Sequence, residues 1–234
     1  MTSRHRDVAL AALGGIGVAL LVVGSAHAHA LSEGNARFVE GSEGAALGPF
    51  VYLGAKHMIT GIDHILFLFG VIFFLYKLRD VVLYVSLFTL GHSLTLLAGV
   101  LGGLRVDPHA VDAVIGLSVA YKAFENLGAF ERLGRWRPDP RHAVLVFGLV
   151  HGLGLATRLQ ELALAPSGLL ANLFFFNAGV EIGQVLALTA LLGGLHLWRA
   201  RESFGRRAFA VNTALLAAGF VLASQHAVGY WVSA

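Results

Sequence analysis

The sequence places ionisable side chains within stretches that are otherwise apolar. Four histidines and three acidic residues share this setting: His57, Asp63, His64, His92, Glu125, His151 and Glu181. Such groups are costly inside a bilayer and generally mark functional sites there. Imidazole and carboxylate groups without thiolates suit divalent ions such as nickel, cobalt, zinc and copper(II). The seven residues are therefore candidate ligands of a transition-metal ion.

The absence of cysteine narrows the chemistry further. The chain has 11 histidines and no cysteine, so disulfides, thiolate metal sites and cysteine nucleophiles are excluded. The sequence contains no H-E-x-x-H pattern, which disfavours a metal-dependent hydrolase. The candidate ligands could line a path that carries a metal ion across the membrane. Three alternatives to such a transport path stay open: an intramembrane metal-dependent enzyme, a haem protein with His92 and His151 as axial ligands, and a metal-binding accessory or sensor protein.

His57 and His64 raise a question of spacing. On a regular helix, residues seven apart share a face but lie about 10 Å apart along the axis, too far for one ion to bind both. Either the two histidines belong to successive sites, or Thr60 and Gly61 loosen the helix and bring them together. Asp63 points elsewhere on the same helix and could orient a histidine of a neighbouring helix.

The elements that carry these residues are long apolar segments. The 234-residue chain is 56% hydrophobic and only 13% charged, which is far from the composition of soluble domains. Crossing a bilayer takes about 20 residues, and six segments are long enough: 50–76, 81–103, 109–130, 142–162, 168–198 and 208–232. We therefore predict an all-α, polytopic membrane bundle of six transmembrane helices over residues 49–234, with the lipid bilayer as its surroundings.

The N-terminus has the pattern of a secretory signal peptide. Arg4 and Arg6 precede an apolar run over 8–23, and alanines alternate with histidines over 26–30, as in an A-x-A cleavage site. We predict a signal peptide over 1–30 and a short periplasmic lead over 31–48. An uncleaved first helix is the alternative.

Basic residues predict the orientation in the membrane. They cluster after the first, third and fifth segments: Lys77, Arg79, Arg132, Arg135, Arg137, Arg141, Arg199, Arg201, Arg206 and Arg207. Basic loops stay in the cytoplasm, so the protein is expected in a bacterial inner membrane with both mature termini in the periplasm. This clustering explains the basic composition without a nucleic-acid partner. In this orientation His57 lies nearest the periplasm and Glu125 nearest the cytoplasm, as a transport path requires.

Each polar group also has a structural interpretation. A single membrane histidine can link helices by a hydrogen bond. Glu125 follows Lys122 by three residues and could simply neutralise it, and Asn177 and Gln184 could join helices. Gly148 and Gly152 form a GxxxG step, which lets another helix approach closely. The number of costly groups in one small bundle nevertheless favours a metal path over packing alone.

Several motifs in order resemble the HupE/UreJ family. The pattern His57-x5-Asp63-His64, with Gly61 two residues before the aspartate, is similar to the family's first-helix signature and to the His-x4-Asp-His signature of nickel/cobalt transporters. The resemblance continues through residues 88–95, 123–126, 147–152 and 176–184. It therefore covers about residues 50–190.

The resemblance implies a membrane protein connected with hydrogenase or urease maturation and regarded as a nickel permease. Met58 follows the first histidine where the nickel-permease branch has proline, and residues 147–184 are more similar to a second branch of the family. We therefore expect a divalent ion as substrate, nickel or cobalt first and copper or zinc next. Metalloenzyme-maturation proteins or periplasmic metal-binding proteins are the expected partners.

Overall fold

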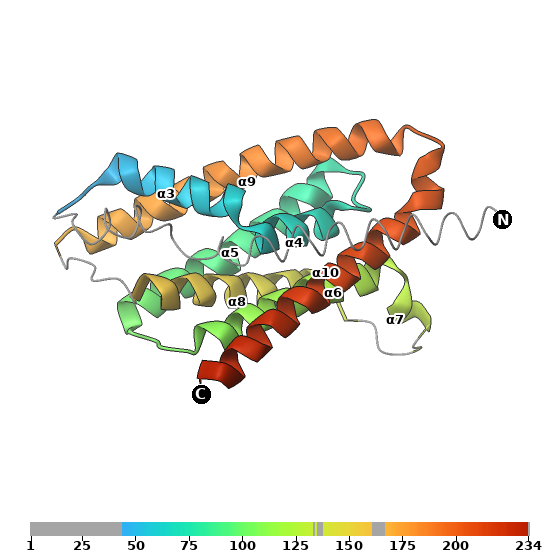
Figure 1. Ribbon diagram of the computed structural model, residues 1–234. Coiled ribbons are helices and arrows are strands. Elements are labelled where there is room, and N and C mark those ends of the chain that lie inside the picture. The colour runs from blue at the N-terminus through green and yellow to red at the C-terminus, as the bar shows by residue number, and fades with distance from the viewer. Residues whose placement is uncertain (1–43, 133, 135–137, 161–166, 234) are drawn as a thin grey trace.

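The computed structural model describes residues 44–132, 134, 138–160 and 167–233. This part of the chain is helical and contains no strand. Its helices are α3 (Leu47–Thr60), α4 (Ile62–Ile72), α5 (Leu78–Gly102), α6 (Pro108–Asn126), α7 (Ala129–Arg132), α8 (Pro140–Gln160), α9 (Leu169–Arg199) and α10 (Ser203–Ser233). The long helices run back and forth between two ends, which we call the α3 end and the α7 end after the helices found there (Figure 1). The predicted signal peptide lies outside the described residues, as does most of the predicted lead.

Length and composition identify the helices that can cross a membrane. Four are long and apolar enough, namely α5, α8, α9 and α10, and a fifth crossing results if α3 and α4 form one span bent by 64°. The prediction of an all-α polytopic membrane bundle is confirmed. The remaining predicted crossing corresponds to α6, which has 19 residues and includes three charged ones, Asp112, Lys122 and Glu125. It carries more charged residues than α5, α8, α9 or α10, and the count of six stays a prediction.

The bundle is built from three tightly packed helix pairs: α3 with α9, α5 with α8, and α6 with α10. Glycine makes each close approach possible. A Cβ atom added at Gly54 of α3 would lie 2.0 Å from a carbonyl oxygen of α9, one at Gly152 of α8 would lie 2.0 Å from a carbonyl oxygen of α5, and one at Gly116 of α6 would lie 2.5 Å from a backbone nitrogen of α10. Small residues at such crossings let backbones touch, which is how helices associate in lipid. The predicted close approach at Gly152 is thus made by α5.

Helix α4 lies among these pairs and begins after a break at Gly61. The Gly61 backbone is extended, with φ −70° and ψ 102°, while its N–H still donates to the carbonyl of His57 at 2.9 Å. At the other end of α4, Arg199 of α9 donates to the carbonyl oxygens of Ile72 and Phe73. These carbonyls have no partner within the helix, so α9 fixes the end of α4 that lies toward the α7 end.

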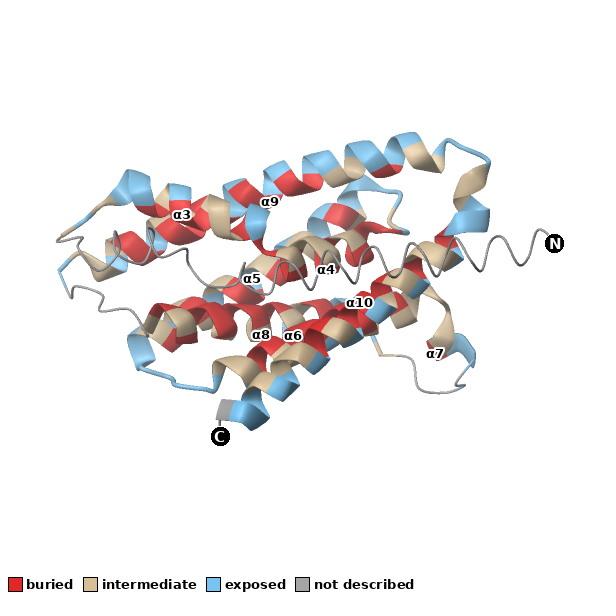
Figure 2. Cartoon of the chain, viewed as in Figure 1, coloured by how far each residue is buried: buried red, intermediate tan, exposed pale blue. Residues whose placement is uncertain are grey.

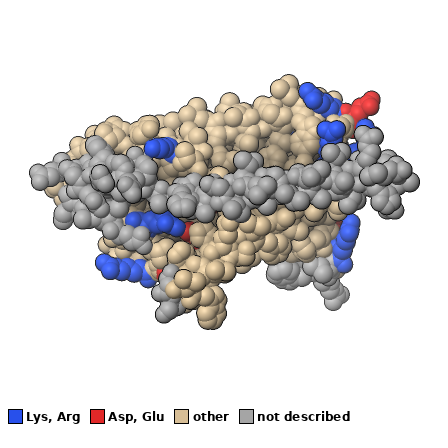
Figure 3. Space-filling view, in the orientation of Figure 1, with Lys and Arg blue, Asp and Glu red and all other residues tan. Residues whose placement is uncertain are grey.

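The pattern of buried and exposed side chains is the one expected of a protein surrounded by lipid. Side chains that face between the helices are buried, whereas the outer face of α9 is largely exposed (Figure 2). Apolar residues make up most of that exposed surface, and on the visible face most charged atoms lie toward the two ends (Figure 3). Large aromatic and aliphatic side chains on α4 form the centre of the core, among them the fully buried Phe67, Leu68 and Ile72.

Candidate metal centre

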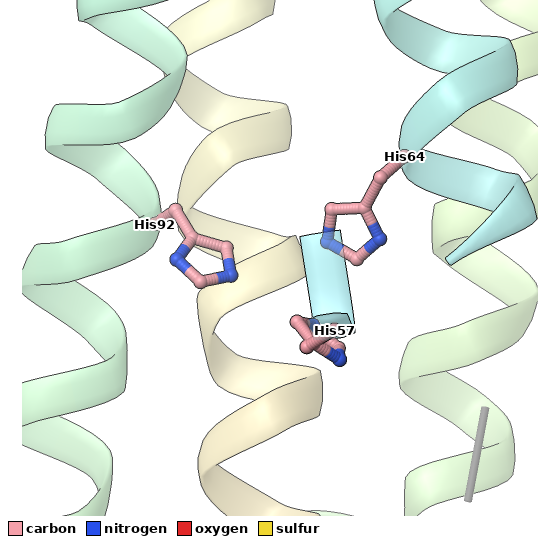
Figure 4. A group of neighbouring side chains, drawn as sticks. All are labelled: His57, His64 and His92. Carbon is pink, nitrogen blue, oxygen red and sulfur yellow. The ribbon is translucent and has the colours of Figure 1, made fainter. Parts of the chain in front are cut away.

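Four of the predicted histidines meet in the middle of the bundle, each carried by a different helix. His57 lies on α3, His64 on α4, His92 on α5 and His151 on α8. The ring centre of His64 is 4.9 Å from that of His57, 5.9 Å from that of His92 and 5.0 Å from that of His151. His64 is therefore the central member, and Figure 4 shows it facing His57 and His92.

The break at Gly61 explains how His57 and His64 come together. On a continuous helix they would lie about 10 Å apart along the axis. The 64° bend between α3 and α4 folds the second histidine back toward the first. Of the two sequence-based alternatives, the loosened helix is the correct one. A Cβ atom at position 61 would lie 2.7 Å from His64 Nδ1, so glycine also provides the space for the ring.

Asp63 contacts the histidine that follows it. One carboxylate oxygen lies 3.1 Å from His64 Nδ1, and both residues are buried, with 2% and 3% of their surface exposed. The extended backbone at Gly61 starts a new helix here and places both residues in its first turn. The Asp63 carboxylate also lies within 4.8 Å of a ligand atom of His151 on α8, a histidine of another helix such as the sequence led us to expect. A carboxylate on Nδ1 holds an imidazole in the tautomer whose Nε2 can bind a metal.

Two sets of ligand atoms are close enough to hold an ion. His57, His64 and His92 offer atoms that all lie within 4.8 Å of one another, and so do Asp63, His64 and His151. His64 belongs to both sets. The structure therefore brings together five of the seven predicted residues around one ring.

Several histidine ring nitrogens of this cluster are placed so that they could bind a metal ion. His64 Nε2 and both ring nitrogens of His92 are buried and have no hydrogen-bond partner. A buried polar atom without a partner costs about 1–3 kcal/mol, which a bound ion would offset. In His151, Nδ1 contacts the carbonyl of Phe147 at 2.7 Å, which leaves Nε2 as the nitrogen suited to a metal. The residues thus fit a borderline divalent ion bound mainly by imidazole.

Glu125 and Glu181 lie apart from the histidines. Glu125 accepts from Lys122 Nζ at 2.9 Å, as the spacing allowed, and borders a cavity of about 330 Å³ toward the α7 end. Glu181 is exposed and lines a groove of about 430 Å³ between α5 and α9. Neither carboxylate belongs to a ligand set with the histidines. The structural interpretation holds for Gln184, which accepts from Thr89 at 2.6 Å and so joins α9 to α5.

An aromatic layer, which the sequence did not single out, lies directly against the cluster. The ring of Phe67 is 5.2 Å from that of Phe88, 5.8 Å from that of Phe147 and 5.3 Å from that of His151, centre to centre. These rings come from α4, α5 and α8. They keep polar groups and water away from one side of the histidines. Their regular spacing by turns of helix from His64, His92 and His151 is the signal that could have indicated them.

The chain matches a known protein family over most of its length. The model of the protein family described as "HupE / UreJ protein" matches residues 33–234. No curated protein and no solved structure gives a significant match.

Proposed function

Since the chain belongs to the HupE/UreJ family, whose members have a nickel or cobalt accessory or permease role in membranes, we propose that it carries a divalent transition-metal ion across the inner membrane. Nickel or cobalt is the first choice of substrate, with copper or zinc next. The ion is the cargo of the protein rather than a resident cofactor. The family resemblance and the imidazole-rich donor set both support this range of ions.

The observation that carries the proposal is the buried cluster around His64. Four histidines, His64 among them, and Asp63 contribute atoms to two ligand sets that share His64. His57, His64 and His92 would hold the ion in one set, and Asp63, His64 and His151 in the other. A site that only stores an ion gains nothing from a shared ligand, whereas an ion in transit can pass from one set to the next while His64 stays bound.

The charged loops support the proposed orientation in the membrane. Lys77, Arg141 and Arg199 lie at the α7 end, which the positive-inside rule assigns to the cytoplasm. The ion would approach from the periplasm, where both mature termini would also lie. In this path Glu125 at the cavity near the α7 end would receive the ion or a proton, and Glu181 would exchange protons through the groove between α5 and α9. Metalloenzyme-maturation proteins would then take the ion in the cytoplasm.

Metal accumulation in cells tests this function. Cells that express the wild type, His64→Ala or His142→Ala are grown with nickel, cobalt, copper or zinc, and their metal content is measured by elemental analysis. His142 is the matched control, because its side chain is 82% exposed and lies outside the cluster. We expect one metal to rise with the wild type and the control but not with His64→Ala.

One result of the same experiment would refute transport. If no metal accumulates although folded protein reaches the membrane, a permease is refuted. A metal that remains bound to purified wild-type protein in that case would point to an accessory, sensor or enzymatic role for the same cluster.

A further inference from the structure

We propose that the aromatic layer of Phe67, Phe88 and Phe147 is a gate between the histidine cluster and the cavity toward the α7 end. The ion leaves the cluster on this side only when the three rings move apart. This role rests on the proposed transport function. The three residues form a barrier and not a binding site, since a phenyl ring carries no nitrogen, oxygen or sulfur atom that could bind the ion.

Three helices repeat one pattern from the cluster toward the α7 end. Each carries a histidine of the cluster, then a phenylalanine of the layer, then a residue that lines the cavity: His64, Phe67 and Val71 on α4; His92, Phe88 and Tyr84 on α5; His151, Phe147 and Pro140 on α8. Neighbours in each series are three, four or seven residues apart and therefore share one face of their helix. The phenylalanines thus lie between the histidines and the cavity on all three helices.

The rings of the layer pack against one another and against the cluster. The ring of Phe67 is 5.2 Å from that of Phe88 and 5.8 Å from that of Phe147, centre to centre. On the side of the histidines, the ring of Phe88 is 5.0 Å from that of His151 and 6.3 Å from that of His64. Phe67 and Phe88 are 0% and 1% exposed, so water does not reach these two rings.

On the other side of the layer, aromatic contacts continue to the cavity. The ring of Tyr121 on α6 is 5.2 Å from that of Phe147 and 5.1 Å from that of Phe130, centre to centre. Phe130 borders the cavity of about 330 Å³, and so do the buried Lys122 and its ion-pair partner Glu125. Charged groups are therefore found again only beyond the aromatic rings.

A layer of this kind stops an ion because it offers no substitute for water. Moving a charge out of water into apolar surroundings is very costly unless other groups take the place of its hydration shell. Hydrophobic constrictions in channels close the pore by excluding water. The two ligand sets around His64 can replace the hydration shell, whereas the phenylalanine rings cannot. The structure therefore holds the cluster closed toward the α7 end.

The reactivity of a thiol placed in the cluster tests the gate without any metal. Because the chain has no cysteine, His92→Cys introduces a single thiol behind the rings. A charged thiol reagent is added to membrane vesicles from the side of the α7 end, and mass spectrometry follows the modification. His142→Cys identifies that side, because its position is 82% exposed there. The thiol of His92→Cys should react far more slowly than that of His142→Cys, and about tenfold faster once Phe67→Ala is added.

Two further variants control this measurement. Phe220→Ala makes the same change at a ring of α10 that is 56% exposed, and it should leave the rate of His92→Cys unchanged. Because loss of a core ring can unfold a protein, Phe147→Ala, at a partly buried ring, is a second way to open the layer and should also speed the reaction. Size-exclusion profiles and helical circular dichroism show which variants are folded. The gate is overturned if the folded Phe67 or Phe147 variant reacts no faster than His92→Cys alone, or if His92→Cys alone reacts as fast as His142→Cys.

Ion flux separates the gate from the proposed function. Proteoliposomes containing the purified protein receive Co²⁺ outside and hold a metal-sensitive dye inside. Phe67→Ala should let Co²⁺ equilibrate several-fold faster than the wild type, while its affinity for Co²⁺ stays within about twofold. A flux no faster than that of a wild type that does transport Co²⁺ contradicts the gate. If no protein carries Co²⁺, transport of this ion is refuted, and the thiol measurement still decides whether the rings form a barrier.

Discussion

Gly61→Ala is the substitution that tests the broken helix most directly. A methyl group at this position would lie 2.7 Å from His64 Nδ1 and 3.2 Å from a carboxylate oxygen of Asp63, whereas ordinary contacts begin at 3.4 Å. The ring must therefore withdraw by about 0.7 Å, well beyond the ±0.2 Å within which metal–ligand distances normally fall. The dihedral angle φ of −70° at Gly61 suits alanine, but the methyl group would also lie 3.0 Å from the carbonyl oxygen of His57.

The substitution also favours a continuous helix. Alanine is about 1 kcal/mol more favourable than glycine inside a helix, so it promotes closure of the break between α3 and α4. A closed helix would move His57 and His64 apart toward the regular separation of about 10 Å along the axis. Because His64 belongs to both ligand sets, we expect metal affinity to fall by about 10–100-fold, the usual effect of losing the groups that orient a ligand.

Titration calorimetry of the purified protein with Ni²⁺ measures this loss. Gly193→Ala is the control, because it makes the same change in α9 at a position with no atom within 4 Å. Its affinity should equal that of the wild type. If Gly61→Ala is folded and binds Ni²⁺ within about twofold of the wild type, less than 0.5 kcal/mol, the break does not assemble the site and the reasoning is wrong.

Three further substitutions separate binding from packing. Asp63→Asn removes the carboxylate beside His64 and should weaken Ni²⁺ binding about 10–100-fold in the same titration. Thr89→Val removes the hydrogen bond to Gln184 and should lower stability by about 1 kcal/mol, seen as a lower unfolding temperature in detergent with metal affinity unchanged. Glu125→Gln deprives its buried lysine partner of a counter-ion; it should destabilise the fold, again without a change in Ni²⁺ affinity.

Contrary results for two of these substitutions would change the interpretation. Wild-type affinity in Asp63→Asn would mean that the carboxylate does not orient the ring. A weaker affinity in Glu125→Gln would place that carboxylate among the ligands of the ion held by the histidine cluster, and not at the separate cavity that it borders.

Much of the fold was predictable because the bilayer imposes a simple rule on sequence. Long apolar runs must be helices in lipid, and the predicted segments agree with the helices to within a few residues, apart from the break at Gly61. Local patterns also predicted the ion pair of Glu125 with Lys122. The GxxxG step of Gly148 and Gly152 predicted one close contact, but not which helix makes it, because such a step describes one surface and not its partner.

The sequence predicted which residues form the candidate site better than it predicted how they are arranged. His57, Asp63 and His64 stood out as costly groups, yet helical spacing alone left open whether they act together. The answer depends on the backbone at Gly61, where glycine permits several conformations and the neighbouring helices select one. Glu181 shows the opposite case: it stood out in the sequence as a candidate ligand, but only the placement of α9 beside α5 shows that it faces a groove and not the histidines.

The division of the bundle into pairs has a consequence for how an ion acts on the whole molecule. His57 comes from the pair of α3 and α9, while His92 and His151 come from the pair of α5 and α8, and the two pairs have few contacts with each other, made through α4 and where α9 meets α5. A bound ion therefore links two helix pairs that otherwise have few contacts with each other. At a concentration 100 times its dissociation constant it would add about 2.7 kcal/mol to the stability of the closed assembly. Release of the ion would remove this link, so that the occupancy of the ion site and the arrangement of the two helix pairs would change together.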